Sequence, residues 1–337
     1  MGGTDHMPTA IGTSSPIPGL GPPGVHGICF SCDSIKDMDI AEEVATRLAA
    51  PAPAPAPATA PATVEATATA TSTATATAPA TTTAAATWYS VGILATDQGL
   101  ALRCAEFCRR HGLHALFHPL DLDVCGTDPL DDRLLRLLGR RADELDSPWL
   151  NIDLAMWVRE GETLLESLVP MPLVDEAVDW AVDRVKHAQD VIGRPLTIEN
   201  APYPFVVGDQ DILTLMTRIA ERADCLMTID VGHLYGLRVQ RGLPPVLPSD
   251  DDIAWDRVVE AHMSGTFVRR FEGGARLVDD KHDWPVGNEV WDLADQLFPR
   301  APQLRSVMAE AEGMNADELT ESVRRFARRA DHWWGAS

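Results

Sequence analysis

The sequence lacks an excess of basic residues and long apolar runs, and we expect it to carry no secretory signal. Its 28 Lys and Arg residues stand against 50 Asp and Glu residues, giving a formal net charge of −22. This acidity disfavours nucleic acid or an anionic membrane as the main partner, because both bind to a basic surface. No apolar run is long enough to cross a bilayer, and no charged segment followed by an apolar one opens the chain. We therefore expect a cytoplasmic protein.

The six cysteines lack the spacing of a disulfide or zinc framework. Cys29 and Cys32 form one C-x-x-C motif, but no second pair at zinc-finger spacing follows it. Cys104 and Cys108 lie four residues apart on a predicted helix, which is typical of packing residues. Reduced thiols are expected, as in a cytosolic protein.

Two segments have compositions that do not support a packed core. Residues 1–24 are rich in Pro, Gly and Ser, and residues 50–87 consist almost wholly of Ala, Thr and Pro. Such tracts have few large apolar side chains to bury against the entropy of ordering, so both are predicted to be disordered. The chain is 45% hydrophobic overall, and we expect a single domain over residues 25–337, interrupted by 50–87.

Strand and helix patterns alternate along the rest of the chain. Short β-branched apolar runs are typical of buried strands, and apolar residues at helical spacing follow most of them. Residues 25–49 and 88–335 together match the usual ~250 residues of a (β/α)8 TIM barrel. The pattern predicts this α/β fold, with the disordered Ala/Thr/Pro-rich insertion after the first strand and helix. The predicted strands are 25–31, 88–94, 114–118, 148–153, 196–199, 227–230, 257–262 and 304–310.

Three local features can be predicted in more detail. Asp209 is expected to cap the helix that follows the fifth strand. A polar loop containing DDKHDWP (279–285) is expected after the seventh strand. Asn315 and Glu318 have the spacing that is typical of a capping box and predict the start of the last helix.

Acidic and imidazole side chains stand at or just beyond the carboxyl ends of the predicted strands. In barrels and open α/β sheets these ends converge on one rim, where active sites lie. Each such residue alone is more often a core histidine, a helix cap or a loop charge, but repetition along six strands indicates a shared site. The strand-end residues are His118, Asp153, Glu199, Asp230, His262 and Glu310, and Asn200, His233, Asp280 and His282 lie just beyond.

The chemistry of this set favours metal ions. Carboxylates and imidazoles that crowd together repel or desolvate one another unless positive charge lies among them. Lys281 is the only basic side chain among these positions. A mixed set of carboxylates and histidines without cysteine suits iron, manganese or zinc. The number of ligands exceeds what one ion needs, which predicts two or three ions.

The ordered motifs at these positions resemble those of the multinuclear non-heme iron-dependent oxidative enzymes. The resemblance covers His118 to Glu310 and is most specific in the D-x-H-x-x-P-V-x-x-x-V-W segment that begins at Asp280. It rests on LTIENAPYPF with Glu199 and Asn200, MTIDVGHLYG with Asp230, VVEAHMSG with His262, LVDDKHDWPVGNEVW with Asp280 and His282, and VMAEAEG with Glu310.

The resemblance implies both a structure and a function. Members are TIM barrels that hold two or three irons, as mixed Fe(II) and Fe(III), at the strand ends. They use O2 to modify residues, often cysteine, of ribosomally made precursor peptides, and a small partner protein usually presents the peptide. A substrate thiolate or other anionic group would bind one iron, beside a second that activates dioxygen. The implied ligands here are His118, Glu199, Asp230, His262, Asp280, His282 and Glu310, with Asn200 as an additional one.

The chain departs from this family pattern at several points. Asn151-Ile152-Asp153 replaces the usual Ser-Glu-His after the fourth strand, so Asp153 would be an anionic ligand in place of an imidazole. His233 stands where Asn is common and would compensate as a nitrogen donor. The glutamates expected after the second strand are absent, and Asp97 is the nearest acid.

Two other classes of function remain open on the sequence alone. A xylose-isomerase-like sugar isomerase or metal-dependent endonuclease would share strand-end Glu, Asp and His ligands. An endonuclease would need a basic rim, which this chain lacks, and an isomerase typically needs a lysine near its metals, for which Lys281 is the candidate. A non-catalytic barrel that acts as a binding partner is favoured only by Asp153.

Overall fold

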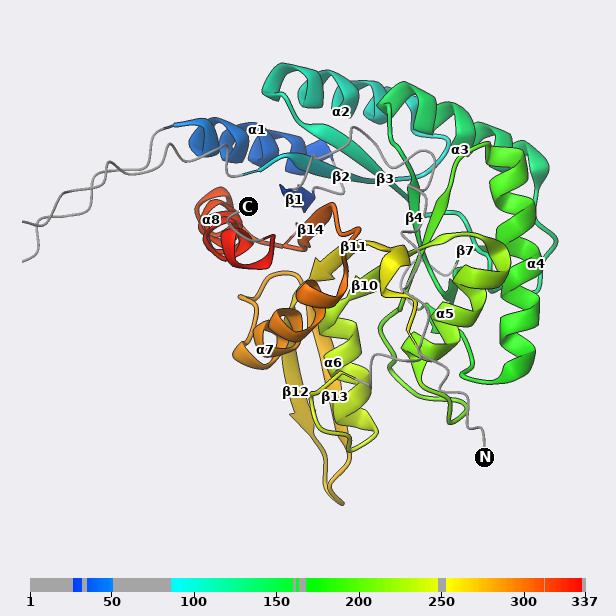
Figure 1. The fold of residues 1–337 in the computed structure, drawn as a ribbon. Helices are drawn as coiled ribbons and strands as arrows, with labels where there is room; N and C mark the ends of the chain where they lie inside the picture. The colour runs from blue at the N-terminus through cyan, green and yellow to red at the C-terminus, as the bar shows by residue number, and fades with distance from the viewer. Residues whose placement is uncertain are drawn as a thin grey trace, which may run out of the picture.

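Eight parallel strands close into a barrel in the computed structural model, which describes residues 27–31, 35–50, 86–159, 162–163, 168–247, 253–311 and 313–334. The order around the barrel is β1-β14-β11-β10-β9-β4-β3-β2, and every neighbouring pair is parallel (Figure 1). This confirms the predicted TIM barrel. The strands are β1 (Gly27–Ser31), β2 (Trp88–Ile93), β3 (His114–Pro119), β4 (Leu150–Asp153), β9 (Leu196–Glu199), β10 (Leu226–Asp230), β11 (Val258–Met263) and β14 (Ser306–Ala309).

Helices follow the strands and cover the outside of the barrel (Figure 1). Their buried faces carry apolar residues such as Leu135 and Leu138, both fully buried. Within the described residues, no helix is both long and apolar enough to cross a membrane. The helices are α1 (Ile35–Ala49), α2 (Gln98–His111), α3 (Asp132–Leu145), α4 (Asp175–Ile192), α5 (Ile212–Ala223), α6 (Val231–Gln240), α7 (Asn288–Leu297) and α8 (Ala316–Trp333).

Two segments of additional short strands interrupt this alternation of strands and helices at the carboxyl ends of the barrel strands. Between β11 and α7, an antiparallel hairpin of β12 (Gly265–Arg270) and β13 (Arg276–Lys281) projects away from the barrel (Figure 1). Its turn contains Gly273 and Gly274 at φ +87° and +88°, a conformation that favours glycine. After β4, short strands form two antiparallel pairs, which are β5 (Ala155–Met156) with β8 (Val169–Pro170) and β6 (Val158–Arg159) with β7 (Glu162–Thr163).

The hairpin corrects the prediction of a polar loop at 279–285. Residues 279–281 lie on β13, where Asp280 pairs with Thr266 across the hairpin. The prediction was wrong because the polar side chains masked a strand whose partner lies only a few residues upstream. This arrangement gives Asp280 a fixed backbone direction that a loop would not supply.

Helix starts and segment boundaries also differ in part from the predictions. Asp211, not Asp209, caps α5, since its side chain accepts from the backbone N–H groups of Leu213 and Thr214. The capping box at Asn315 and Glu318 is confirmed, with Glu318 accepting from the backbone N–H of Asn315 at 3.1 Å. The ends of the barrel strands lie within two residues of their predicted bounds.

The predicted insertion and tail fall mostly outside the described residues. At the end of the insertion, Ala86 is buried and Thr87 hydrogen-bonds to the backbone of Ile28 and His114. These two residues therefore belong to the barrel, and the predicted boundary at 87 was too late. The predictions of disorder for 1–24 and for 51–85 concern residues that the structure does not describe.

The interior of the barrel is divided along its axis. Near the starts and middles of the strands, the interior is filled by an apolar cluster separate from the main core. The carboxyl ends of the strands hold polar and charged side chains instead. The apolar cluster comprises Cys29, Trp88, Leu116, Trp149, Leu226, Val259 and Met308.

Candidate metal centre

Four buried side chains from four strands meet at the carboxyl end of the barrel. Glu199 ends β9, Asp230 ends β10, His262 lies near the end of β11 and Glu310 directly follows β14. Each offers one ligand-type atom, and these atoms all lie within 4.8 Å of one another. None of the four residues is more than 7% exposed. Parallel pairing places these ends together, as the strand pattern predicts.

His262 lies at the centre of this group. Its Nδ1 is 3.1 Å from Oε1 of Glu199 and 3.5 Å from Oε1 of Glu310. On the other edge of the ring, Nε2 is 3.1 Å from Oε1 of Glu260. The imidazole thus contacts carboxylates on both edges.

A second group shares Glu199 with the first. Atoms of Asp153, Glu199 and His233 lie within 4.8 Å of one another, and all three residues are buried. Oδ2 of Asp153 is 3.3 Å from Nε2 of His118, which extends this group to the end of β3. The sharing of Glu199 makes the two groups one continuous set of donors.

The hairpin and the β14–α8 connection complete the set on its more exposed side. Oδ2 of Asp280 is 3.2 Å from Nε2 of His233 and 2.8 Å from Nε2 of His282. Nε2 of His282 is also 3.9 Å from Oε2 of Glu310. The His282 side chain is 33% exposed, against 8% or less for Asp153 and Glu310. The set therefore opens to solvent on the side of His282.

Asn200 holds the backbone of Asp230. Its Nδ2 donates to the carbonyl of Asp230 at 2.8 Å, and its Oδ1 accepts from the N–H of Asp230 at 3.0 Å. Asp230 in turn caps α6 by accepting from the backbone N–H of His233. These bonds fix Asp230 and His233 relative to each other, and ligation by Asn200 itself stays a prediction.

The buried donors fit metal ions by their chemistry. Oδ2 of Asp230, Nδ1 of His262 and Oε2 of Glu310 are buried without hydrogen-bond partners in the described part of the chain. Buried polar atoms are usually paired, and each unpaired one needs an explanation. The ion pairs described at these residues have only histidine as the basic partner. Carboxylate and imidazole donors in this mixture suit iron, manganese or zinc.

The pKa directions show how strongly the metal-free site attracts positive charge. Burial raises the pKa of Asp230 well above its usual range, and the nearby Glu310 and Glu199 raise it further, although His233 opposes them. Burial alone would lower the pKa of His262, but Glu199, Glu260 and Glu310 hold it well above its usual range. Burial likewise opposes the shift at His118, where Asp153 raises the pKa to about 9. Protons and cations therefore compete for the same atoms.

Two buried residues that contact this set were missed in the sequence. Glu260 lies two residues before His262 on β11, and both point to the same side of the strand. Strand periodicity alone could have identified Glu260, since residues i and i+2 share a face. Asn151 donates to Oε2 of Glu199, and its own Oδ1 accepts from Thr197 at 2.8 Å. Its role depends on the alignment of β4 with β9, which the sequence does not contain.

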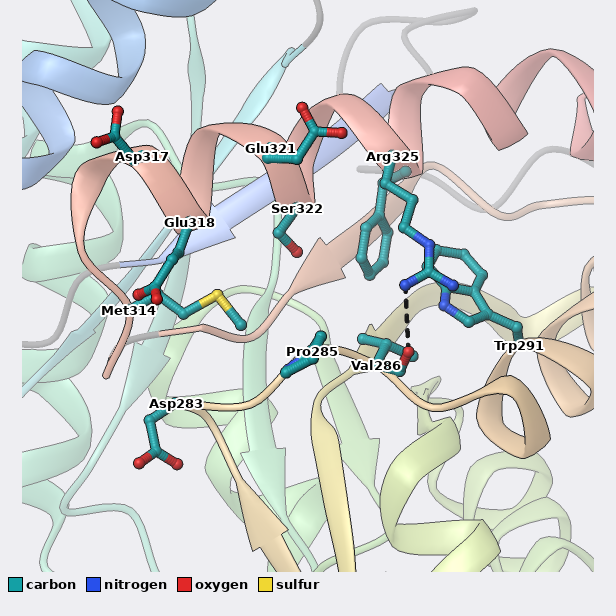
Figure 2. A pocket seen from close by; sticks show the side chains of 11 residues that line it. Asp283, Pro285, Val286, Trp291, Met314, Asp317, Glu318, Glu321, Ser322 and Arg325 are labelled. Atoms are coloured by element: carbon teal, nitrogen blue, oxygen red, sulfur yellow. Dashed lines mark hydrogen bonds between the residues drawn. The ribbon is translucent and has the colours of Figure 1, made fainter.

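A groove of about 460 Å³ lies between α8 and the segment that follows His282. Figure 2 shows α8 on one side, with Ser322 and Glu321, and the segment after β13, with Pro285 and Val286, on the other. Asp283, next to His282, begins the groove. Trp291 closes one end, where Arg325 packs over its ring at 4.8 Å and donates to the carbonyl of Val286 at 3.3 Å. Met314 and Phe326 add apolar surface to the lining.

The acidic residues of the groove are mostly paired. Asp317 pairs with Arg47, Glu321 pairs with Arg328 at 2.6 Å, and Glu318 belongs to the capping box of α8. The groove therefore offers mainly apolar surface.

The sequence model of one family matches most of this chain. The model described as RiPP precursor modification enzyme MbnB/TglH/ChrH, where RiPP denotes a ribosomally made and modified peptide, matches residues 95–330. A UPF0276 protein of Pseudomonas aeruginosa is 32% identical over 189 residues, and one of Nitrosospira multiformis is 29% identical over 188 residues. Each match covers 54% of this chain and 62% of the relative, so the chain spans about three-fifths of these curated relatives.

A solved structure has the same fold at low sequence identity. The xylose isomerase domain protein of Planctomyces limnophilus aligns over 91% of this chain and 98% of its own chain, with a TM-score of 0.50 and 10% identity. At that identity, the likeness establishes the barrel and nothing about the reaction.

Proposed function

Because this chain belongs to the family of RiPP precursor modification enzymes MbnB/TglH/ChrH, we propose that it is an iron-dependent oxidase or oxygenase acting on a precursor peptide. The substrate would be a side chain of that peptide, in many cases cysteine, and O2 would be the co-substrate. A small partner protein that presents the peptide is part of the proposal. Membership of the family supports the proposal of a peptide substrate, whereas the proposal of bound metal rests on the geometry of the site.

One observation carries the metal part of the proposal. Ligand-type atoms of Glu199, Asp230, His262 and Glu310 lie within 4.8 Å of one another in a buried setting. Three of these four residues carry a buried atom without a hydrogen-bond partner in the described chain. An arrangement of this kind is destabilised by its own charge unless cations bind to it.

The chain would hold two or three irons along the continuous donor set. Glu199 belongs to both groups and is the candidate for a ligand shared between two ions. Bound iron would supply the redox chemistry with O2. The protein would position the donors through Asn200 and Asn151, and the barrel interior beneath the donors would exclude water.

The peptide would approach from the side of His282. That side chain is the most exposed of the histidines in the donor set, and the groove of Figure 2 starts beside it at Asp283. A substrate thiolate or other anionic group would reach the metals there, while an apolar neighbouring segment would lie in the groove. The apolar lining and the volume are within the usual range for a ligand site.

Elemental analysis of protein purified without oxygen tests the metal part. We expect two to three irons per chain, and the addition of a cysteine-containing peptide should change the visible absorption of the ferric centre. The same peptide with serine in place of cysteine is the matched control. Bound zinc or manganese with no iron would favour a sugar isomerase or endonuclease, and a chain that binds no metal would favour a non-catalytic binding partner.

Filling the groove tests the path of the peptide. Ser322→Trp should block the groove and weaken binding of the precursor peptide by about tenfold or more, while metal content stays at two to three irons. Ser322→Ala leaves the groove open and serves as the control. Equal peptide binding by both variants would remove the groove from the proposal and leave the metal centre intact.

A further inference from the structure

A buried carboxylate lies beneath the candidate metal centre and is not one of its donors. Glu260 is 1% exposed and extends from β11 toward the apolar cluster of the barrel interior. Its Oε1 is 3.1 Å from Nε2 of His262, and its Oε2 accepts from Nε1 of Trp149 at 2.8 Å. Both oxygens of this carboxylate are therefore engaged, one by His262 and one by Trp149.

The backbone of β11 explains why Glu260 points inward. The register between β10 and β11 shifts by one residue, because Met227 pairs with Val258 while the next residue, Thr228, pairs with Glu260. A β-bulge of this kind re-aims the side chains that follow it. Beyond the bulge, alternation places Glu260 and His262 on the same side of the strand, one above the other.

His262 has two ring nitrogens in different surroundings. Nε2 faces Glu260, whereas Nδ1 faces Glu199 and Glu310 and makes no hydrogen bond in the described chain. Carboxylates flank both nitrogens, but in the described chain only Glu260 lies in hydrogen-bond geometry with the ring. A neutral imidazole has one nitrogen with a proton and one with a lone pair, so this hydrogen bond fixes the proton on Nε2. The lone pair then lies on the other nitrogen.

We infer that Glu260 is a positioning residue that keeps the proton of His262 on Nε2 and so presents Nδ1 to the metal. This inference rests on the proposed metal centre. Carboxylates that accept a hydrogen bond from a ligating histidine orient the ring and raise its basicity. The indole N–H of Trp149 in turn holds the carboxylate of Glu260 in one orientation. The metal charge above would offset the cost of a carboxylate in apolar surroundings.

The orientation of Trp149 makes the inference testable with an isosteric substitution. In Glu260→Gln, the indole N–H of Trp149 requires the amide oxygen, so the amide NH₂ faces His262. An NH₂ donor at Nε2 moves the ring proton to Nδ1, where it blocks the metal. The affinity for Zn²⁺, measured by competition with a chelator, should fall about 10- to 100-fold. The fold should persist, because glutamine has nearly the same shape.

The double variant supplies the rescue. When Trp149→Phe is combined with Glu260→Gln, the amide is free to turn and accept from Nε2–H, so most of the lost Zn²⁺ affinity should return. Trp149→Phe alone should change the affinity little, because Glu260 still accepts from His262. A role confined to stability would give the opposite order, with the double variant worse than either single one.

Nitrogen NMR of the histidines in the Zn²⁺-loaded protein provides a second readout. In the wild type, His262 should be bound to metal at Nδ1 and carry its proton on Nε2. If the wild type binds Zn²⁺ or iron and Glu260→Gln binds it within twofold of the same affinity, the inference is wrong and the proposed function stands. If the wild type binds neither metal, the proposed function itself fails. Metal bound to Nε2 would also overturn the inference.

Discussion

The two ends of the barrel interior differ in the chemistry of the side chains that they bury. Toward the strand starts, tryptophans such as Trp88 and Trp149 pack with aliphatic side chains and Cys29. At the carboxyl ends, the carboxylates and imidazoles of the two candidate groups are also buried and lie within a few ångströms of one another. The first end gains free energy from burial, whereas the second loses it unless cations bind. The apolar end therefore stabilises the barrel, and the polar end holds the proposed function.

Removing a nitrogen donor from the polar end should have the largest effect. His262→Ala should lower metal affinity by more than the ~100-fold typical of residues outside the donor set, and oxidation of the peptide should stop. His282→Ala should also lose iron, while the exposed His187→Ala is the matched control. Iron counting and circular dichroism decide the matter. A fully metallated and active His282→Ala protein would remove that histidine from the site.

Asp153 tests whether the second donor group belongs to the polar end. The side chain contacts His118, and no backbone N–H bond to it is found among the described residues, which argues against a helix cap. Asp153→His should keep the metal and raise the reduction potential, because a neutral donor stabilises Fe(III) less than an anion does. Asp153→Ala should lose an ion. Mössbauer spectra and iron counts that match the wild type in both variants would show that Asp153 does not bind metal.

In the metal-free protein, Asp230→Asn should relieve the destabilisation that buried charge causes at the polar end of the barrel. Asparagine keeps the cap of α6 but removes a charge whose pKa is raised by burial and by Glu310 and Glu199. A carboxyl with a raised folded pKa contributes stability that is complete below about pH 4 and is lost as the pH rises through the folded value. Metal-free Asp230→Asn should thus match the wild type at low pH and exceed it at pH 8 by at least about 1 kcal/mol.

The comparison of urea unfolding at the two pH values checks this sign. Bound metal should reverse the order, because the wild type alone offers the Asp230 carboxylate. A wild type that is more stable than Asp230→Asn at pH 8 without metal would contradict the view that this end is destabilised by its own charge.

Replacing residues 51–85 should change neither end of the barrel interior and should have the smallest effect of these substitutions. Their composition offers few large apolar side chains, so a short Gly/Ser linker should leave secondary structure and metal content nearly unchanged. Ala86 and Thr87 are kept, because Thr87 bonds to the backbone of Ile28 and His114. A variant that loses its metal or precipitates would show that the replaced segment packs on the barrel.

Local pattern was sufficient for the elements but not for their mutual placement. The eight barrel strands occur where alternation and β-branched runs predict them, because burial on both faces requires an apolar run of that length. The hairpin at Gly265–Lys281 was missed, since a polar strand paired only with its neighbour has no apolar signal. Helix α6 was also missed, because it starts at Val231, directly after β10, without a connecting segment.

The sequence by itself determined which residues stand at strand ends, and with them the candidate donors His118, Asp153, Glu199 and Asp230. Strand length and polarity are local properties, so a single chain segment encodes them. Only the tertiary structure decided which of these side chains lie close enough to bind one ion. It also decided that Nδ1 of His262 faces Glu199 and Glu310, and that Glu260 lies beneath His262. These relations depend on closure of the barrel and on a one-residue register shift between β10 and β11, which are properties of paired strands and of no single segment.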